Sequence, residues 1–419
     1  MPSSLHTHSY MSLLDGFSSP EENLKRASEL GLKAIAITEH GEVTSWPYYS
    51  ELKDKYPDVK LLYGIEAYEC EDREVKDKNS KYWHLIIIAK NEAGRQAVNR
   101  LSTLGHLHGF YSRPRITKED IAKEDTNNLI ILSACLASRL SRTDDYDTCV
   151  KLVQEYKSLF PHYFLEVQAH ANSEQEKYNQ KIMRLANDTH TKVVVTNDVH
   201  AATKEALYYQ DYFLRIAHDT ETAAEIYEGC YFMSRKEQHE VLDSQIGYDA
   251  AEWCINNTDE VADLCDYVDM PWHEPELPKI KIPPQYANSA AYLKALVHEG
   301  WKKRRIDRFD AEKQKIYRKR VDDELFVIEK KDFCDYFLIL VDYINWCKQN
   351  DVIVGPGRGS AAGSLVCYLI GITQLDSIKY ELDFGRFLTI ERKDLPDVDV
   401  DVSDRAKVVE YLTQKYGED

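Results

Sequence analysis

The stretch AIAITEHG, residues 34 to 41, is an apolar run that leads directly into polar residues and a histidine. The apolar part is too short for a helix and is bounded by polar residues, so it predicts a buried strand of a parallel sheet. Similar runs recur along the first half of the chain, with amphipathic stretches between them. They lie at residues 61–65, 85–89, 129–133, 163–167 and 193–196.

A helix is predicted before the first of these strands. Ser19 is placed to be its N-cap, Pro20 takes the first helical position, and Glu22 can complete a capping box. Gly31 is placed to end the helix. Strand, helix and strand repeated in this way predict an α/β fold with a parallel sheet, either closed or open.

Residues that can bind metal ions accompany these runs. Most of them follow directly after a predicted strand, while His84 lies just before the run 85–89. Because the carboxyl ends of strands in a parallel barrel meet at one mouth, we expect these side chains to converge there. A lone histidine is more often structural, but a whole set placed by one rule predicts a metal site. The set is His6, His8, Asp15, His40, Glu66, His84, Cys135, Asp198 and His200.

A glycine-rich turn and a run of aspartates lie close together near the other end of the chain. The turn reads VGPGRGSAAGS, residues 354–364, and the acidic run reads PDVDVD, residues 396–401. Glycines let several backbone N–H groups face one anion, and Arg358 adds positive charge. Asp397, Asp399 and Asp401 would share one face of an extended strand, where they could hold divalent ions. This pairing indicates nucleotidyl transfer. Behind the turn, residues 365–370 predict a buried helix or strand.

These segments resemble the C-family of bacterial replicative DNA polymerases, the alpha subunits of DNA polymerase III. Residues 336–417 carry YFLILVDYINW, VGPGRGSAAGSLVCYLIGIT, FGRFLTIER, LPDVDVDVSDR and EYLTQKYG. Nearer the start, LHTHSYMSLLDG, ITEHG, YGIEAY, GFYSRPRI, LSACLA and TNDVH resemble that family's PHP domain, named after polymerase and histidinol phosphatase. The resemblance covers nearly the whole chain.

For the first part, the resemblance implies a distorted TIM-like β/α barrel that binds up to three metal ions. The family's ligand positions match the whole set above, although the position of Cys135 varies within the family. It also implies metal-dependent phosphodiester hydrolysis, with a 3′-to-5′ exonuclease as the expected activity and Asp198 as a catalytic residue. Mixed imidazole and carboxylate ligation suits Zn²⁺ or Mn²⁺, with iron as the alternative.

For the last part, the resemblance implies the beginning of a polymerase palm. Asp397 and Asp399 match the aspartates that bind catalytic Mg²⁺, and Asp401 would support them. Further candidates for contacts to the dNTP triphosphate are Arg358, Gly359, Ser360 and, less directly, Arg386.

In the family, the third catalytic aspartate, the thumb, the rest of the palm, the fingers and the clamp-binding region come after the segment that these 419 residues match. We therefore expect this chain alone not to extend a primer on a DNA template. A sliding clamp would be bound only through the absent region. That region would be supplied either in a longer polypeptide or by a partner chain of a split polymerase.

Prolines mark a boundary between the two parts. They occupy positions 271, 275, 278, 283 and 284, and such crowding ends regular structure. The predicted domains are residues 1–270 for the PHP domain, 271–288 for the linker and 289–419 for the incomplete palm. Beyond the linker, residues 290–305 and 311–328 have helical spacing of apolar residues.

The composition indicates how strongly this chain could bind DNA and in which compartment it would lie. The chain has 53 Lys and Arg against 71 Asp and Glu, a formal net charge of −18, so we expect this chain alone to bind DNA weakly. A hydrophobic fraction of 43% and a charged fraction of 30% are typical of a soluble globular protein. The nine cysteines form no CxxC pair, and no signal peptide or membrane span is visible. These features predict a reduced cytoplasmic protein, in a bacterial cell or a virus-infected one, without a membrane partner.

Three functions remain open. The first is the amino-terminal part of a replicative polymerase with an intact nuclease-type metal site. The second is a stand-alone metallophosphoesterase that acts on nucleotides or sugar phosphates. The third is a non-catalytic subunit of a split polymerase. The presence of bound metal would distinguish the non-catalytic subunit from the two enzymes. The substrate would distinguish the polymerase-associated nuclease from the stand-alone phosphoesterase.

Overall fold

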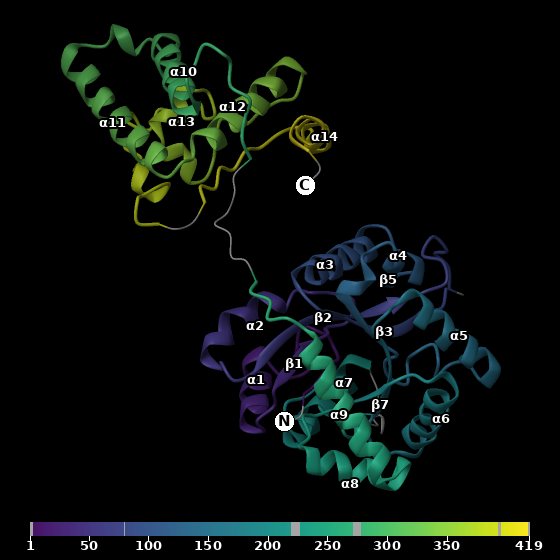
Figure 1. Cartoon of the computed structure of the whole chain (residues 1–419). Helices are drawn as coiled ribbons and strands as arrows, with labels where there is room; N and C mark the ends of the chain where they lie inside the picture. Colours follow the sequence, from purple (N-terminus) through teal and green to yellow (C-terminus); the bar gives the residue numbers. More distant parts are fainter. Residues whose placement is uncertain (1–2, 79, 219–226, 271–277, 393–394, 418–419) are drawn as a thin grey trace. The chain divides into compact units, whose positions relative to one another are not determined.

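The structure, a computed structural model, describes residues 3–78, 80–218, 227–270, 278–392 and 395–417. The chain forms two compact units, Met1–Pro271 and Trp272–Asp419 (Figure 1). The first part of the predicted linker, residues 271–277, lies outside the described residues.

The first unit is an α/β structure in which helices lie around the outside of a curled sheet (Figure 1). Its strands are β1 (Ala34–Ile37), β2 (Lys60–Glu69), β3 (Trp83–Ala89), β4 (Phe110–Tyr111), β5 (Arg113–Ile116), β6 (Leu129–Leu132), β7 (Tyr163–Gln168) and β8 (Val193–Thr196). Its helices are α1 (Pro20–Glu29), α2 (Trp46–Leu52), α3 (Glu92–Leu107), α4 (Lys118–Ala122), α5 (Tyr146–Leu159), α6 (Ser173–Thr189), α7 (Lys204–His218), α8 (Arg235–Ile246) and α9 (Tyr248–Leu264). The strands predicted from the apolar runs are confirmed.

The sheet closes through the amino-terminal segment. The strand order is β4-β5-β2-β3-β6-β7-β8, and β1 pairs with β2. Ser4 bridges to Ile35 of β1, while Thr7 bridges to Val199 just after β8. The strands therefore form a ring, which is the distorted barrel that the resemblance implies.

β3 departs from the parallel sheet expected from the sequence. It runs antiparallel to β2 and to β6, and β4 and β5 are also antiparallel to each other. Parallel neighbours need a crossover, usually a helix, and the described part of the connection from β2 to β3 contains none. Because β3 is reversed, its first residues lie at the same end of the barrel as the last residues of β2 and β6.

Alternate residues of the strands pack into two different cores. Ile35 and Ile37 contribute to the outer core beneath the helices, whereas Ala34 and Ala36 contribute to the inner core. Val261 of α9 also belongs to the inner core, next to the strand starts. This strand alternation decides which side chains can enter the barrel.

Helix α1 begins as predicted. The Ser19 hydroxyl accepts a hydrogen bond from the backbone N–H of Glu22 at 3.2 Å, and the Glu22 carboxylate accepts from the backbone N–H of Ser19 at 2.8 Å. Leu24 and Ala27 are fully buried on the inner face of this helix. The helix is therefore fixed at its start by a capping box and along its length by burial.

The second unit is mainly helical. Its helices are α10 (Ser289–Lys303), α11 (Ala311–Lys330), α12 (Cys334–Gln349), α13 (Leu365–Leu369) and α14 (Arg405–Tyr416). The predicted helices at 290–305 and 311–328 correspond to α10 and α11, and the stretch behind the glycine-rich turn is a helix, not a strand. Phe337 and Leu365 are fully buried in its core.

The acidic run 396–401 does not form a strand in the structure. It is an extended segment beside the glycine-rich turn, tied by a bridge between Val354 and Val402. All nine cysteines lie within the described residues, where they are buried and none forms a disulfide. Within the described ranges, no helix combines the length and the apolar character that crossing a membrane requires.

Candidate metal centre

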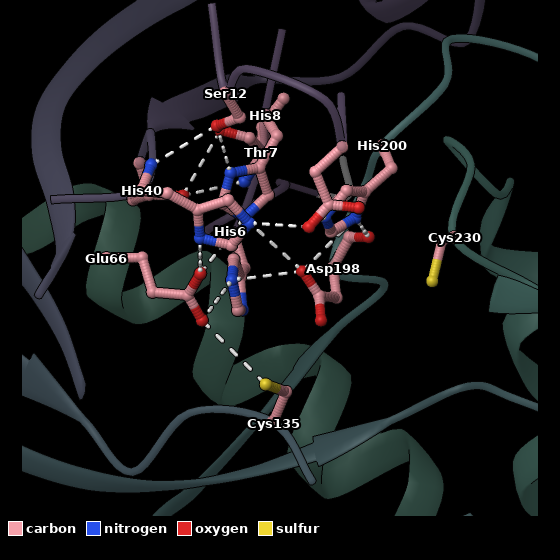
Figure 2. A network of polar contacts seen from close by, with 12 residues as sticks. His6, Thr7, His8, Ser12, His40, Glu66, Cys135, Asp198, His200 and Cys230 are labelled. Atoms are coloured by element: carbon pink, nitrogen blue, oxygen red, sulfur yellow. Dashed lines mark hydrogen bonds and ion pairs between the residues drawn. The ribbon is translucent and has the colours of Figure 1, made fainter. Parts of the chain in front are cut away.

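The predicted ligands meet at one end of the barrel, although they come from the whole length of the first unit (Figure 2). His6 and His8 lie on the amino-terminal segment, on either side of the bridge made by Thr7. The His6 Nε2 atom is 3.2 Å from Glu66 Oε1 and 3.1 Å from Asp198 Oδ1. The His8 Nε2 atom is 3.4 Å from both Glu66 Oε2 and Asp198 Oδ1. Glu66 and Asp198 thus face the same two imidazoles.

His40 and His200 join the same cluster through Asp15. The His40 Nδ1 atom is 2.6 Å from Glu66 Oε2, and its Nε2 atom is 2.9 Å from Asp15 Oδ2. The His200 Nε2 atom is 3.5 Å from the same Asp15 oxygen. The His8 ring lies beside both of these histidines, with ring centroids 4.3 Å from His40 and 4.4 Å from His200.

His84 and Cys135 complete the cluster on the β3 and β6 side. The His84 Nδ1 atom is 2.8 Å from Glu66 Oε1, and the Cys135 sulfur lies 3.6 Å from His84 Nδ1. Burial, together with the carboxylates of Asp198 and Glu66, raises the pKa of the Cys135 thiol well above its usual value. The sequence prediction that the nine side chains gather at one place therefore agrees with the geometry.

Strand alternation explains why these side chains point inward. Glu66 lies inside β2, not after it as the sequence suggested, and it shares the inner face with Leu62. His84 shares the inner face of β3 with Ile86. Asp198 follows β8 with a left-handed backbone, φ 50°. Such a conformation is uncommon for a residue with a side chain and concentrates at functional sites.

The cluster fits divalent cations. Seven buried nitrogen and oxygen atoms approach one another closely but lack hydrogen-bond partners, which is costly unless cations lie between them. These atoms are His6 Nε2, His8 Nε2, Asp15 Oδ1, His40 Nδ1, Glu66 Oε2, Asp198 Oδ1 and His200 Nε2. Ligand atoms within 4.8 Å of one another form three overlapping triads, which are His8 with His40 and His200, His6 with His8 and Asp198, and His40 with Glu66 and His84.

The acids and imidazoles of the cluster shift each other's protonation. Burial would lower the pKa of His40, but the carboxylates of Glu66 and Asp15 outweigh it and raise that pKa to about 9. Burial opposes ionisation of Glu66, yet His84, His6 and His40 hold its pKa well below the usual range. The cluster is therefore a site in which buried negative charge is balanced by positive charge.

A cavity of about 120 Å³ opens beside the cluster. Besides several of the predicted ligands, polar side chains line it, namely Gln168, His170, Gln175, Tyr227 and Cys230. A small group such as a phosphate therefore has access to the side of the cluster that faces Asp15, His40 and His84.

Two buried acids next to the cluster were not predicted. Glu39 hydrogen-bonds to Ser12, and Glu166 hydrogen-bonds to His6. Glu166 lies within β7, whereas the predicted ligands were expected at strand ends. A charged residue inside an otherwise apolar strand was the signal that could have identified Glu166.

In the second unit, the glycine-rich turn packs against the acidic run. Arg358 donates from a terminal guanidinium nitrogen to Asp399 Oδ1 at 2.9 Å and from Nε to Asp401 Oδ1 at 3.1 Å. The backbone N–H of Gly355 donates to the Asp401 carbonyl at 2.9 Å. A Cβ at Gly359 would lie 2.5 Å from Asp399 Oδ2, so a larger residue would force the Asp399 carboxylate to shift.

The other predicted residues of the palm are less closely joined. Asp397 and Ser360 are exposed, and Arg386 lies in a short 3-10 turn, Phe384–Arg386. Over the described ranges, no hydrogen bond or ion pair connects the Arg386 side chain with the acidic run. The Asp401 side chain is 66% exposed, so this carboxylate is largely open to solvent.

The chain is similar to known families over both units. Residues 4–170 match the PHP domain, and residues 291–419 match the domain described as the bacterial DNA polymerase III alpha NTPase domain. The DNA polymerase III subunit alpha of Aquifex aeolicus is 36% identical over 99% of this chain and 37% of that protein. The corresponding subunit of Treponema pallidum is 34% identical over 99% of this chain and 36% of that protein. The chain thus spans a little more than a third of the length of these relatives.

Among solved structures, an amidohydrolase from Chromobacterium violaceum overlaps with 48% of this chain and 88% of its own. Its sequence identity is 13% and the TM-score is 0.35. Because the identity and the TM-score are low, this similarity does not support a family or a function.

Proposed function

The chain belongs to the family of bacterial DNA polymerase III alpha subunits, and from this premise we propose that its first unit is a metal-dependent 3′-to-5′ exonuclease. The observation that carries the proposal is the convergence of His8, His40, Asp198 and the other predicted ligands on one buried cluster beside an accessible cavity. We propose Zn²⁺ or Mn²⁺ as the bound ions, up to three, with iron as the alternative, because imidazole and carboxylate ligands are mixed.

The bound cations would supply Lewis-acid activation of water and neutralise the charge of the phosphodiester. The protein's own part is to hold the ligands rigidly. Glu66 is fully buried and contacts His40 and His84 with different oxygens, so it would help to hold the cations together with these histidines. Asp198 is positioned by its left-handed backbone and faces His6 and His8. The cavity beside them, about 120 Å³ in volume, suits a terminal phosphodiester better than a duplex.

For the second unit, we propose binding of Mg²⁺ and a dNTP on the way to primer extension. Asp397 and Asp399 would bind Mg²⁺, while Arg358, Gly359 and Ser360 would hold the triphosphate, with Arg386 as a further candidate. The contact between Arg358 and Asp399 supports the proposal, because it places the cationic and acidic parts of the site together. Primer extension on DNA would require further parts of the polymerase, including the third aspartate, and the sliding clamp would bind through those parts.

A comparison of two variants tests whether DNA degradation depends on the metal site of the first unit and not on the acidic run of the second. Labelled primer-template DNA is incubated with Mn²⁺ and the intact chain, the Asp198→Ala variant or the Asp397→Ala variant. We expect Asp198→Ala to abolish degradation and Asp397→Ala to leave it unchanged. A label at the 5′ end, which survives stepwise loss from the 3′ end, gives the direction. Equal loss of degradation in both variants would contradict two separate sites.

Two further measurements show whether a loss of degradation results from misfolding of a variant. Bound metal is counted in each protein after gel filtration, and thermal unfolding reports whether the variants are folded. A chain that binds metal and cleaves small phosphate esters but no DNA would favour the stand-alone phosphoesterase. A chain that binds no metal and gains no hydrolysis with Mn²⁺ would favour a non-catalytic subunit.

A further inference from the structure

We infer that Glu39 and Glu166, two buried acids outside the predicted ligand set, are positioning residues that fix which ring nitrogen of His8 and of His6 faces the metal site. The inference rests on the proposed metal site and goes beyond it, since it assigns roles to residues that bind no ion themselves. Both carboxylates are completely buried. Both are joined by hydrogen bonds to a histidine of the cluster, one directly and one through a serine.

Glu39 accepts every hydrogen bond that it makes. Its two oxygens accept the backbone N–H of Ser9 at 3.2 and 3.0 Å, and Oε1 also accepts the Ser9 hydroxyl at 2.6 Å. Its other oxygen accepts the hydroxyl of Ser12 at 2.6 Å. A carboxylate has no proton to give, so the single hydroxyl proton of Ser12 points toward Glu39.

The oxygen of Ser12 is then left as an acceptor for its other neighbours. The backbone N–H of His40 donates to it at 3.2 Å, and His8 Nδ1 lies 2.8 Å from it (Figure 2). Because the proton of Ser12 is already committed, the hydrogen on the His8 ring must sit on Nδ1. The Nε2 lone pair of His8 is consequently free, and it faces Glu66 and Asp198 at 3.4 Å.

Glu166 fixes His6 in the same way without an intermediate. It lies in β7, on the inner face that also carries Phe164. Its Oε1 atom accepts Thr196 Oγ1 at 2.6 Å, Gln168 Nε2 at 3.0 Å and His6 Nδ1 at 2.9 Å. With only donors around that oxygen, His6 carries its hydrogen on Nδ1 and turns Nε2 toward the cluster.

A third histidine follows the same pattern. The His200 Nδ1 atom lies 2.7 Å from the backbone carbonyl of Asp198, which can only accept. Three imidazoles therefore offer Nε2 to the centre of the site while an outer acceptor holds Nδ1. In metal proteins, loss of such an outer partner typically weakens metal binding by about 10- to 100-fold.

A purely structural role predicts a different result. Glu39 also ties the loop of Ser9 and Ser12 to the end of β1, so its loss could weaken the fold without affecting the ring orientation. In that case unfolding temperature would fall while the zinc affinity of the folded protein stayed the same. A positioning role predicts the reverse, a fall in affinity at nearly unchanged unfolding temperature.

The test measures Zn²⁺ affinity of the full chain by competition with a chromogenic chelator. Ser12→Ala, Glu39→Gln and Glu166→Leu are compared with Glu69→Gln, a change of another buried acid of the first unit that hydrogen-bonds Tyr156. Leucine is used at position 166 because the amide oxygen of a glutamine could still accept from His6 Nδ1. We expect each of the first three to weaken Zn²⁺ binding about 10- to 100-fold and the control to bind as the unchanged protein does. Since Ser12 and Glu39 act in series, the double variant should be no weaker than the more affected single one.

The outcomes separate this inference from the proposed function. An unchanged protein that binds no Zn²⁺ or Mn²⁺ would overturn both. Normal binding by the unchanged protein together with equal binding by Ser12→Ala and Glu166→Leu would overturn only the positioning role. If a carboxylate variant fails to fold, Ser12→Ala still decides, because it removes only the hydroxyl that links Glu39 to His8.

Discussion

The His84 Nδ1 atom lies 2.8 Å from Glu66 Oε1 across the antiparallel pair of β2 and β3. Tyr68 is the direct backbone partner of His84. Glu66 lies two residues before Tyr68, on the same face of β2. His84 stands at the beginning of its strand and Glu66 in the later part of its own. They meet only because β3 runs against its neighbours. The direction of one strand thus decides whether a histidine belongs to the site.

This topology gives a matched comparison between two histidines. His84 precedes the reversed strand β3, whereas His162 precedes the parallel strand β7 and contacts Lys90 at 3.0 Å. We expect His84→Ala to weaken binding of Zn²⁺ or Mn²⁺ by about tenfold or more, and His162→Ala to leave it unchanged. The measurement is metal content after dialysis against a chelator. Equal metal retention in both variants would remove His84 from the ligand set.

Two glycines with nearly the same φ test the approach of the glycine-rich turn to the acidic run. Gly31 has φ 65° and Gly359 has φ 63°, so alanine is strained at both. Gly359 also has ψ −155°, a combination that is essentially confined to glycine. A Cβ on Gly31 would meet no atom within 4 Å, whereas one on Gly359 would lie 2.5 Å from Asp399 Oδ2. We expect Gly31→Ala to cost about 1 kcal/mol of unfolding free energy, and Gly359→Ala to cost more and also to weaken dNTP binding. Denaturant unfolding and nucleotide titration measure the two effects. Normal dNTP affinity in Gly359→Ala would argue against the triphosphate site.

The buried Glu324 is expected to hold the helix that follows this turn. Its carboxylate accepts the backbone N–H groups of Leu365 and Val366 and the hydroxyl of Ser364, and Arg320 pairs with it at 2.6 Å. Glu324→Ala would leave these donors and the Arg320 charge unpaired, so we expect a loss of about 3–5 kcal/mol. Glu312→Ala in the exposed first turn of the same helix is the control. Amide exchange in residues 365–369 should accelerate only in the first variant.

The positions of the strands could be predicted from the sequence, because a short apolar run between polar residues has few other ways to be buried. The direction of β3 could not, since it depends on how a connection without a helix returns to the sheet. The sequence therefore placed His84 beside a strand without explaining how it reaches the mouth.

Side chains that act through others were the part of the site that the sequence did not predict. Glu39 is adjacent to His40, and Ser12 lies in the loop before Asp15, so neither stands out by residue type or position. Their roles depend on a hydrogen bond of 2.8 Å between His8 and Ser12 and on one of 2.6 Å between Ser12 and Glu39, which are 27 residues apart. Likewise, the exposure of Asp401 depends on the packing of the second unit and not on the alternation of the acidic run.

Glu69, at the end of β2, gives a prediction about stability and pH. Its side chain is 1% exposed and accepts a hydrogen bond from the Tyr156 hydroxyl. Burial raises the pKa of Glu69 to about 6, against 4.5 for an unburied glutamate, although Tyr156 and Arg139 oppose the shift. The folded state therefore holds this proton more tightly than the unfolded state does.

A carboxyl whose pKa is raised on folding adds stability below its unfolded pKa and loses that contribution as pH rises through the folded value. We expect the unfolding free energy of the unchanged protein, measured against Glu69→Gln, to fall by about 2 kcal/mol in total between about pH 3.5 and pH 7, most steeply between pH 4.5 and pH 6, and then to level off. Glutamine does not titrate, so the difference between the two proteins isolates this group. Urea unfolding of both proteins in small pH steps gives the curve. A difference that rises with pH in this window would mean that Glu69 is stabilised as a carboxylate, and the attribution of its pKa to burial would be wrong.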